Sequence, residues 1–141
     1  MTTKIVVDTN VFISTLIGQS ESASRELVRQ CLQGKYQPLM GNALLAEYYD
    51  VVNRDNITNL CPLTNTEKTN LLAAFMSVCQ WVRVYYLWRP NLPDEADNHL
   101  IELAVAGDAQ IIATRNIKNF KRSQLKFPQL EILQPEEVLN Y

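Results

Sequence analysis

Short apolar runs rich in β-branched residues alternate along this 141-residue chain with longer segments of helical periodicity. The runs that have the length and composition of strands are "KIVVD" at 4–8, "YQPLM" at 36–40, "WVRVYY" at 81–86, "AQIIAT" at 109–114 and "LEIL" at 130–133. Continuous apolar strands are typical of a parallel sheet that helices cover on both faces. The alternation therefore predicts an α/β fold, a three-layer sandwich whose central, mostly parallel sheet has about five strands.

The segments between these runs carry helix signals. We expect helices over residues 10–17, 22–33, 42–54, 64–80 and 93–107, and a short helix that Pro135 opens. Asn42 is placed to cap the third of these, "TNTE" at 64–67 is a capping-box pattern, and Gly34 and Gly107 are placed to end two helices. Pro38 predicts an edge or irregular position for the second strand.

Composition restricts the class of protein. Apolar residues make up 47% of the chain and the net charge is −2, so no global basic field indicates nucleic-acid binding. The three cysteines are widely spaced and show no zinc-ligand spacing, which favours reduced thiols in a cytoplasmic protein. No apolar stretch reaches membrane-spanning length, and we expect no signal peptide. Without repeats or linkers, residues 1–141 are expected to form one domain.

Asp8 stands where the first apolar strand stops. In parallel α/β sheets, sites form beyond the carboxyl ends of the strands, where the strand order reverses. Thr114 ends another strand, so the two residues open into one crevice if their strands are neighbours. Asp97 belongs to the first turn of the helix before that strand, and Glu47 is placed mid-helix to point in from the other side. This pattern predicts a group of carboxylates around a divalent cation.

Oxygen ligands and clustered negative charge are what Mg²⁺ requires, and a bound cation can activate water for attack on phosphorus. Each residue also has a structural explanation. Asp8 is a residue type that is common in turns, and Glu47 suits the solvent-exposed face of a helix. Asp94 is a candidate helix cap, and Asp97 suits the positive N-terminal end of a helix. The metal-site hypothesis therefore depends on these side chains lying together.

Four stretches together carry a family likeness: "VVDTNVFIS", "LLAEYYDVVNR", "DEADNHLIELA" and "QIIATRNIKNF". In this order and spacing, they resemble the PIN domain, particularly the bacterial group of toxin components of toxin–antitoxin systems, of which VapC-type toxins are the familiar example. The likeness extends over nearly the whole chain. It implies a parallel sheet with an acidic pocket and a metal-dependent endoribonuclease that uses Mg²⁺ or Mn²⁺. It also implies an RNA substrate, a cognate antitoxin protein and a homodimer.

The resemblance also implies roles for individual residues. The expected catalytic acids are Asp8, Glu47 and Asp97, the expected metal ligands are Asp8, Asp97, Asp94 and Asn116, and the expected supporting residues are Asn10 and Thr114. The sequence departs from the family pattern at Asn116 and Asn119, where acids are usual. Each change removes a negative charge and keeps a carbonyl oxygen, so a second cation would be less well neutralised.

Two other classes of function stay open. A PIN-like domain weakened by Asn116 and Asn119 would bind RNA or a protein without cleaving. A phosphotransferase resembling the haloacid dehalogenases would use Asp8 as a nucleophile, but that family expects a second Asp where this chain has Asn10.

A basic stretch starts at the mouth of the expected pocket. Arg115, Lys118, Lys121 and Arg122 predict a strip that contacts RNA phosphates, with Phe120 or Phe127 as stacking surfaces. The alternative is a solvated loop whose aromatic side chains turn into the core. Neighbouring positions on a helix do not face each other, so His99 is given no role beside Asp97. The aromatic stretch around Trp81 suits either the core or a surface for a dimer or an antitoxin.

Overall fold

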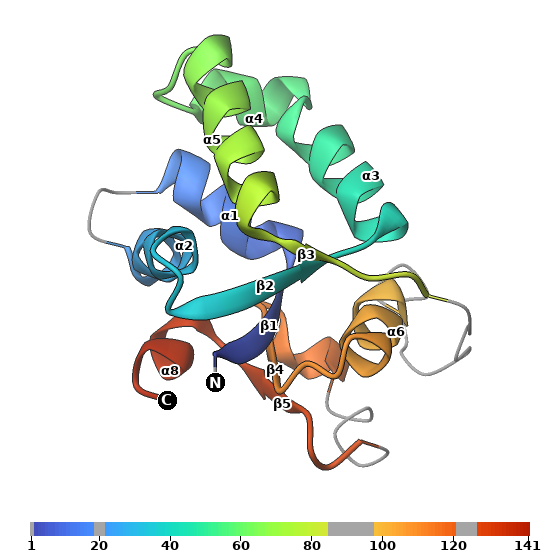
Figure 1. Cartoon of the computed structure of the whole chain (residues 1–141). Helices are drawn as coiled ribbons and strands as arrows, with labels where there is room; N and C mark the ends of the chain where they lie inside the picture. The colour runs from blue at the N-terminus through green and yellow to red at the C-terminus, as the bar shows by residue number, and fades with distance from the viewer. Residues whose placement is uncertain (1, 19–21, 85–97, 121–126) are drawn as a thin grey trace.

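The computed structural model describes residues 2–18, 22–84, 98–120 and 127–141, and Figure 1 shows the arrangement of the chain. Its elements, in chain order, are β1 (Thr3–Val7), α1 (Thr9–Ile17), α2 (Ala23–Leu32), β2 (Tyr36–Met40), α3 (Asn42–Val52), α4 (Asp55–Leu60), α5 (Asn65–Val78), β3 (Gln80–Trp81), α6 (Asn98–Ala106), β4 (Ile111–Ala113), the 3₁₀ helix η2 (Ile117–Phe120), β5 (Glu131–Leu133) and α8 (Pro135–Leu139). None of the described helices is long and apolar enough to cross a membrane.

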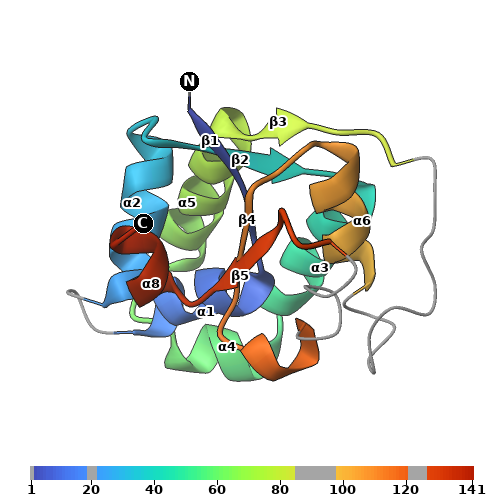
Figure 2. The ribbon, with the colours of Figure 1, turned by 90° about the horizontal axis from the view of Figure 1, so that it is seen from below.

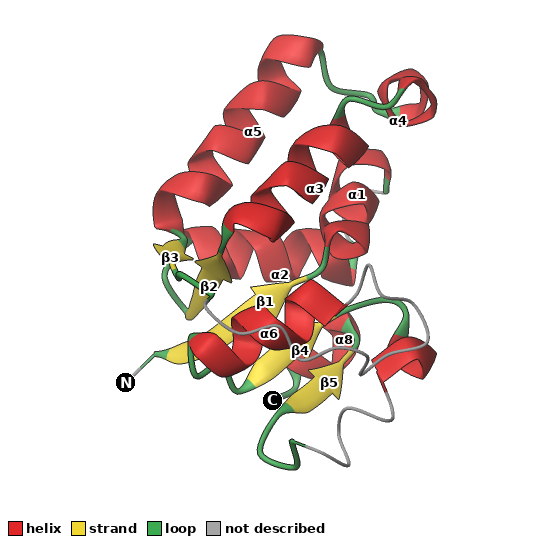
Figure 3. Ribbon diagram, turned by 90° about the vertical axis from the view of Figure 1, so that its right-hand side faces the viewer, coloured by secondary structure: helices red, strands yellow, loops and turns green. Residues whose placement is uncertain are grey.

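The described strands form one five-stranded sheet in the order β3-β2-β1-β4-β5, and every pair in it is parallel. Helices α2 and α5 pack on β2 from one side, while α6 contacts β1, β2 and β4 (Figure 3). Right-handed crossovers explain this layering, because the chain first moves outward from β1 to β3 and then returns past β1 to β4. The predicted three-layer α/β sandwich is confirmed.

The centre of the sheet is its most buried part. In β1, the side chains of Ile5, Val6 and Val7 are at most 1% exposed, and β4 is buried along its whole length. Figure 2 shows β1 and β4 side by side from below the molecule. A strand with a neighbour on each edge and a helix layer on each face has no exposed side, which is why this sequence shows a continuous apolar run.

The prediction of an edge or irregular position for the strand that contains Pro38 was wrong. Strand β2 lies inside the sheet, and Pro38 is in register with Ile5 of β1. The other neighbour, β3, is only two residues long and pairs with Leu39 and Met40. At Pro38 itself, β2 therefore has one strand partner, as an edge strand does, and the missing N–H is tolerated.

Most helix boundaries follow local signals. The Thr64–Glu67 capping box is present at the start of α5, and Gly34 has a φ of 86° after α2, the left-handed conformation that favours glycine. Gly107 follows α6 at a point where a Cβ atom would lie 2.5 Å from Leu39 Cδ1. The expectation for Asn42 was wrong, because the N-cap of α3 is Gly41 and no side chain caps it.

Two further elements differ from expectation. Helix α4, only six residues long, was not predicted, because a segment of that length has too few apolar positions to show a period. Strand β3 ends at Trp81, and residues 82–84 are not in a strand, although 81–86 were predicted as one. Residues 85–86 of that prediction lie outside the described part of the chain.

Candidate active site

Asp8 lies at the carboxyl end of the central strand, at the point where the strand order reverses. Its backbone N–H donates to the carbonyl of Ala113, at 2.9 Å, which extends the β1–β4 pairing by one residue. Thr114 similarly donates its backbone N–H to Leu133 of β5, at 3.0 Å. These bonds fix both residues at one edge of the sheet. The expected juxtaposition of Asp8 with Thr114 is therefore present.

The Asp8 carboxylate is 4% exposed and is surrounded by hydrogen-bond donors. Its Oδ2 accepts from the hydroxyl of Thr114 at 2.8 Å and from the side-chain amide of Asn10 at 3.2 Å. Its Oδ1 accepts from the hydroxyl of Thr9 at 3.3 Å. A buried carboxylate requires such donors to offset the loss of hydration. The donors also hold both oxygens in fixed positions.

Asn10 is itself held in place. Its amide nitrogen also lies 3.2 Å from the Thr114 hydroxyl, and its Oδ1 accepts the backbone N–H of Arg115 at 3.0 Å. The side chain therefore links the first turn of α1 to the end of β4. Because the nitrogen and the oxygen of the amide both form hydrogen bonds, Asn10 presents a fixed N–H to Asp8.

Glu47, from the middle of α3, reaches the same site through Thr9. The Thr9 hydroxyl lies 2.7 Å from Glu47 Oε1, so one hydroxyl is within hydrogen-bond distance of two carboxylates. Burial tends to raise the pKa of Glu47, but hydrogen bonds from His99 and Thr9, with the charges of His99 and Arg54, lower it below its usual range. Glu47 is therefore ionised at neutral pH.

His99 is the site residue that sequence reasoning missed. Its Nε2 lies 2.5 Å from Glu47 Oε2, and its side chain is only 13% exposed. Among the described residues, its Nδ1 has no hydrogen-bond partner although the atom is buried. The sequence argument considered only the neighbours of His99 along its own helix. The actual partner lies across the gap between α6 and α3, and no spacing within one helix reveals it.

Tyr48 supports the strand end that presents Asp8. Its hydroxyl donates to the backbone carbonyl of Val7 at 2.7 Å, and the side chain is fully buried. Burial raises the pKa of Tyr48 well above its usual value, so the hydroxyl stays protonated and remains a donor. The neighbouring Tyr49 is 51% exposed, so one tyrosine of the pair is in the core and the other is at the surface.

We expect Tyr48→Phe to lower the free energy of unfolding by about 1–3 kcal/mol, because a buried carbonyl loses its donor. Urea unfolding followed by circular dichroism measures this loss. Tyr49→Phe is the matched control, since its hydroxyl is at the surface, and should change stability by less than about 0.5 kcal/mol. Equal effects of the two substitutions would show that the Val7 bond contributes nothing specific.

The remaining predicted site residues are placed differently. Asn116 and Lys118 are exposed beyond Thr114, and the Asn116 backbone N–H donates to the Thr114 hydroxyl at 3.1 Å. Arg115 bonds to Glu136 at 2.6 Å and to the hydroxyl of Ser24 at 2.8 Å, so its guanidinium links β4 to α8 and α2. Asp94, Asp97, Lys121 and Arg122 lie outside the described residues.

Phe120 is fully buried in the core, and Phe127 is partly buried against it. Phe120 is therefore not a stacking surface for RNA, because its side chain turns into the core. The three cysteines are unpaired, and burial raises the pKa of Cys31 and of Cys79 to about 12. Both of these thiols are protonated at neutral pH and are not nucleophiles.

The oxygen atoms that could bind a metal at this edge of the sheet fit a hard divalent cation. Carboxylate oxygens of Asp8 and Glu47 converge on the Thr9 hydroxyl, and oxygen ligands are what Mg²⁺ and Mn²⁺ prefer. Within residues 2–18, 22–84, 98–120 and 127–141, no group of three histidine, cysteine or acidic side chains is close enough to hold a metal. The described part of the site thus supplies two carboxylates.

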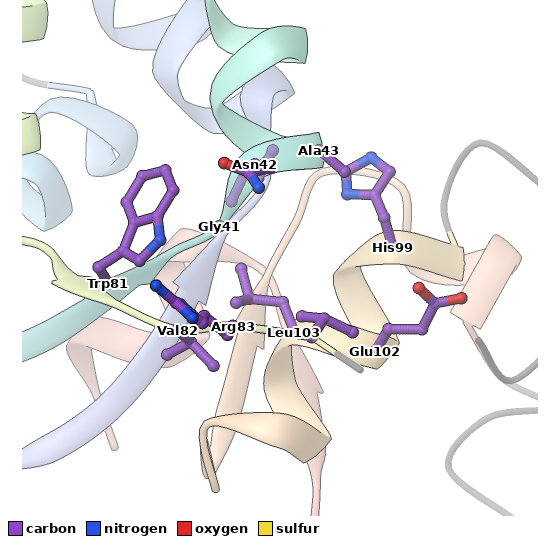
Figure 4. A pocket seen from close by; sticks show the side chains of 11 residues that line it. Gly41, Asn42, Ala43, Trp81, Val82, Arg83, His99, Glu102 and Leu103 are labelled. Carbon is purple, nitrogen blue, oxygen red and sulfur yellow. The ribbon is translucent and has the colours of Figure 1, made fainter. Parts of the chain in front are cut away.

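Two hollows flank the Glu47–His99 pair. One, of about 620 Å³, is lined by Thr9, Asn10, Ile13, Ser14, Glu47, Val51 and Arg54. The other, of about 570 Å³, lies among α3, α6 and the segment that follows β2 and β3, and His99 is part of its wall (Figure 4). The hydrogen-bonded Glu47–His99 pair therefore separates two open spaces at the carboxyl edge of the sheet.

This fold and this acidic site at the sheet's reversal point define a class of protein. Residues 4–118 match the family model of the PIN domain, and the chain belongs to that family. Because the matched family is the PIN domain, the alternative of a phosphotransferase resembling the haloacid dehalogenases loses its support. No curated protein matches the chain in sequence.

A solved structure has a similar fold. A chain in the crystal structure of VapBC2 from Rickettsia felis, bound to a DNA fragment from their promoter, superposes with a TM-score of 0.57 at 15% sequence identity. The similarity covers 92% of the present chain and 96% of that chain. At this identity, the likeness establishes the common fold over almost the full length of both chains.

Proposed function

We propose that this protein is a metal-dependent endoribonuclease and the toxin of a toxin–antitoxin pair. Membership of the PIN family supports the nuclease, and the solved VapBC2 structure of similar fold supports the toxin–antitoxin setting. The observation that carries the proposal is the Asp8 carboxylate, buried at the sheet's reversal point, held by hydrogen bonds from Thr114 and Asn10 and lying 3.3 Å from the Thr9 hydroxyl. A structural turn residue would not need this arrangement at the point where α/β folds place their sites.

Asp8 and Glu47 would hold the cation, with Asp97, Asp94 and Asn116 as further ligands. Mg²⁺ or Mn²⁺ would neutralise charge on the scissile phosphate and lower the pKa of water. Thr114 and Asn10 would fix the Asp8 oxygens, and His99 would fix the Glu47 carboxylate through its hydrogen bond. Lys118, with Lys121 and Arg122, would contact the RNA backbone, whereas Arg115 is already engaged with Glu136.

The proposal includes partners. A cognate antitoxin would cover the acidic site, and the active form would be a homodimer in the cytoplasm. The paired assembly named for the similar solved structure, VapBC2, supports an antitoxin partner. RNA is the proposed substrate because the exposed basic residue Lys118 lies in the 3₁₀ helix η2, four positions after Thr114 at the carboxyl end of β4.

The test is cleavage of end-labelled, single-stranded RNA by the purified protein. We expect cleavage with Mg²⁺ or Mn²⁺ and none in EDTA, with activity restored when excess metal is added back. Circular dichroism in EDTA must show the folded state, so that metal removal is not confused with unfolding. EDTA removes the divalent cation that the carboxylate oxygens would bind. Cleavage that continues unchanged in EDTA would therefore contradict the proposed metal dependence.

A second candidate is a PIN domain that binds RNA or protein without cleaving it. Both carboxylate oxygens of Glu47 already have partners in Thr9 and His99, and Asn116 stands where the family usually has an acid. Fewer negative charges mean weaker attraction for a cation. This candidate predicts RNA binding by the purified chain and no cleavage with any divalent metal.

We expect Asn116→Asp to raise Mn²⁺ affinity by about tenfold, because a carboxylate near the cation adds an attraction of roughly 1–2 kcal/mol at a partly exposed site. Isothermal titration with Mn²⁺ measures the change, and RNA cleavage should rise with it. Asn53→Asp, at the far end of α3, is the matched control and should leave the affinity unchanged. An unaltered affinity in Asn116→Asp would show that residue 116 does not face the metal.

A further inference from the structure

The hollow of about 570 Å³ beside His99 is lined by aromatic, apolar, charged and polar side chains. Apart from His99, these side chains have no role in the proposed cleavage. Its walls come from the start of α3, from α6 and from the segment that begins at β3. Figure 4 shows Trp81 and His99 on opposite sides of the pocket, with Asn42 at the first turn of α3 between them. A space of this size is within the range of small-molecule pockets.

Trp81 supplies an aromatic face. It is the last residue of β3, the edge strand of the sheet, and 49% of its surface is exposed. The large aromatic side chains Phe12, Phe75 and Phe120 are fully buried, so the chain does hide such groups where packing allows. A half-exposed tryptophan on a pocket wall is a platform on which a planar group can stack.

Arg83 supplies a positive charge on the same wall. Among the arginines that the structure describes, it alone has no hydrogen bond or ion pair from its side chain to a described residue; the others are Arg25, Arg29, Arg54 and Arg115. The first turn of α3, which also lines the pocket, contains no acidic residue. The acidic residue in the lining is Glu102, which Figure 4 shows on the His99 side, away from Trp81.

The pocket is continuous with the proposed catalytic site through a single contact. His99 lines the pocket, and its Nε2 bonds to Glu47, which lines the hollow on the other side. Glu47 in turn shares the Thr9 hydroxyl with Asp8. A ligand that occupies the pocket therefore lies beside the His99 side chain that bonds to Glu47.

We propose that this pocket binds one nucleotide of a single-stranded RNA, with the base stacked on Trp81 and the adjoining phosphate on Arg83. The inference rests on the proposed function for the identity of the ligand as RNA. An aromatic face beside a guanidinium that bonds to no described residue matches a base and its phosphate, and this pairing is typical of single-strand binding surfaces. The pocket then positions the strand so that the next phosphate lies over the Glu47–His99 pair.

The test is the affinity for a fluorescein-labelled, single-stranded oligoribonucleotide, measured by anisotropy in EDTA with Asp8→Asn as the parent protein. Cleavage is absent under these conditions, so binding alone is read. We expect Trp81→Ala to weaken binding about tenfold, because a stacked base contributes roughly that much, and Trp81→Phe to retain most of the affinity. Trp81→Ala should leave the salt dependence of binding unchanged.

Arg83→Gln should act differently. The slope of log affinity against log salt should become shallower by about 0.7, the value for one phosphate contact with a single strand. Tyr141→Ala and Arg29→Gln are matched controls, since they remove an exposed aromatic and an exposed arginine that do not line the pocket. Both controls should bind RNA as the parent does.

The outcomes separate this proposal from the nuclease. Loss of affinity in Trp81→Ala, without any cleavage by the unsubstituted protein, would support the pocket and overturn the nuclease. Metal-dependent cleavage with unchanged affinity and salt slope in both variants would overturn the proposal that the pocket binds a nucleotide, while the proposed nuclease would stand. Absence of measurable RNA binding by the parent would overturn it as well.

Discussion

Asp8→Asn is expected to lower metal-dependent RNA cleavage by at least about 10²-fold, the loss typical of removing one group that stabilises transition-state charge. The substitution keeps the size of the side chain and removes its charge. It also replaces one of the two acceptor oxygens that face Thr9, Asn10 and Thr114 by an N–H₂ group, so the hydrogen bonds around this buried side chain must rearrange. We therefore expect a parallel loss of about 1–3 kcal/mol in the free energy of unfolding.

The cleavage rate is measured under single-turnover conditions, at a temperature where circular dichroism shows the variant to be folded. Asp108→Asn is the matched control. Asp108 lies in the turn before β4, at the opposite edge of the sheet, and its φ of 59° suits asparagine as well as aspartate. Cleavage that survives in Asp8→Asn would point to a contaminating nuclease and defeat the assignment of the site.

Phe75→Ala is expected to lower the free energy of unfolding by about 3–5 kcal/mol, the range for a fully buried phenylalanine. Phe75 has no exposed surface, and its ring centroid lies 5.9 Å from that of Tyr48 and 5.6 Å from that of Phe12. These three rings join α5 to α3 and α1, the helices that carry Glu47 and Thr9. Removing the central ring leaves a cavity that rigid neighbours fill only in part.

Urea unfolding followed by circular dichroism measures this loss, and it should also appear as a lower melting temperature. Leu60→Ala is the matched control, since Leu60 is 64% exposed and its truncation should cost less than about 0.5 kcal/mol. A loss below about 1 kcal/mol in Phe75→Ala would show that the three rings do not form a tightly packed unit. Packing around the sheet would then contribute more to the stability of the fold than packing of these three rings.

Sequence reasoning predicted those parts of the fold that depend on local signals. The apolar run before Asp8, the capping box at Thr64 and the glycine after α2 each act within a few residues, so the printed sequence contains the whole cause. The meeting of Asp8 with Thr114 was also predictable, because parallel strands bring their carboxyl ends to one edge. It still required the assumption that these two strands are neighbours.

Features that depend on contacts between distant elements were not predictable in the same way. His99 on α6 meets Glu47 on α3, and Arg115 bonds to Glu136 of the C-terminal helix α8. Pro38 led to the prediction of an edge or irregular position because proline lacks a backbone N–H, and the sequence near it does not show that its partner strand β3 is only two residues long. In each case, the deciding partner is supplied by tertiary packing and not by any repeat or motif.

The position of β1 also determines when the site can form during synthesis. The hydrogen bond from Thr114 to Asp8 spans 106 positions, and β1 pairs with β4 only after the intervening helices have been made. Contacts of such long range are slow to form, because the loop they close is large. A nascent chain that has not yet reached Thr114 therefore has an Asp8 without this donor, and the acidic site is incomplete until β4 has been made and has paired with β1.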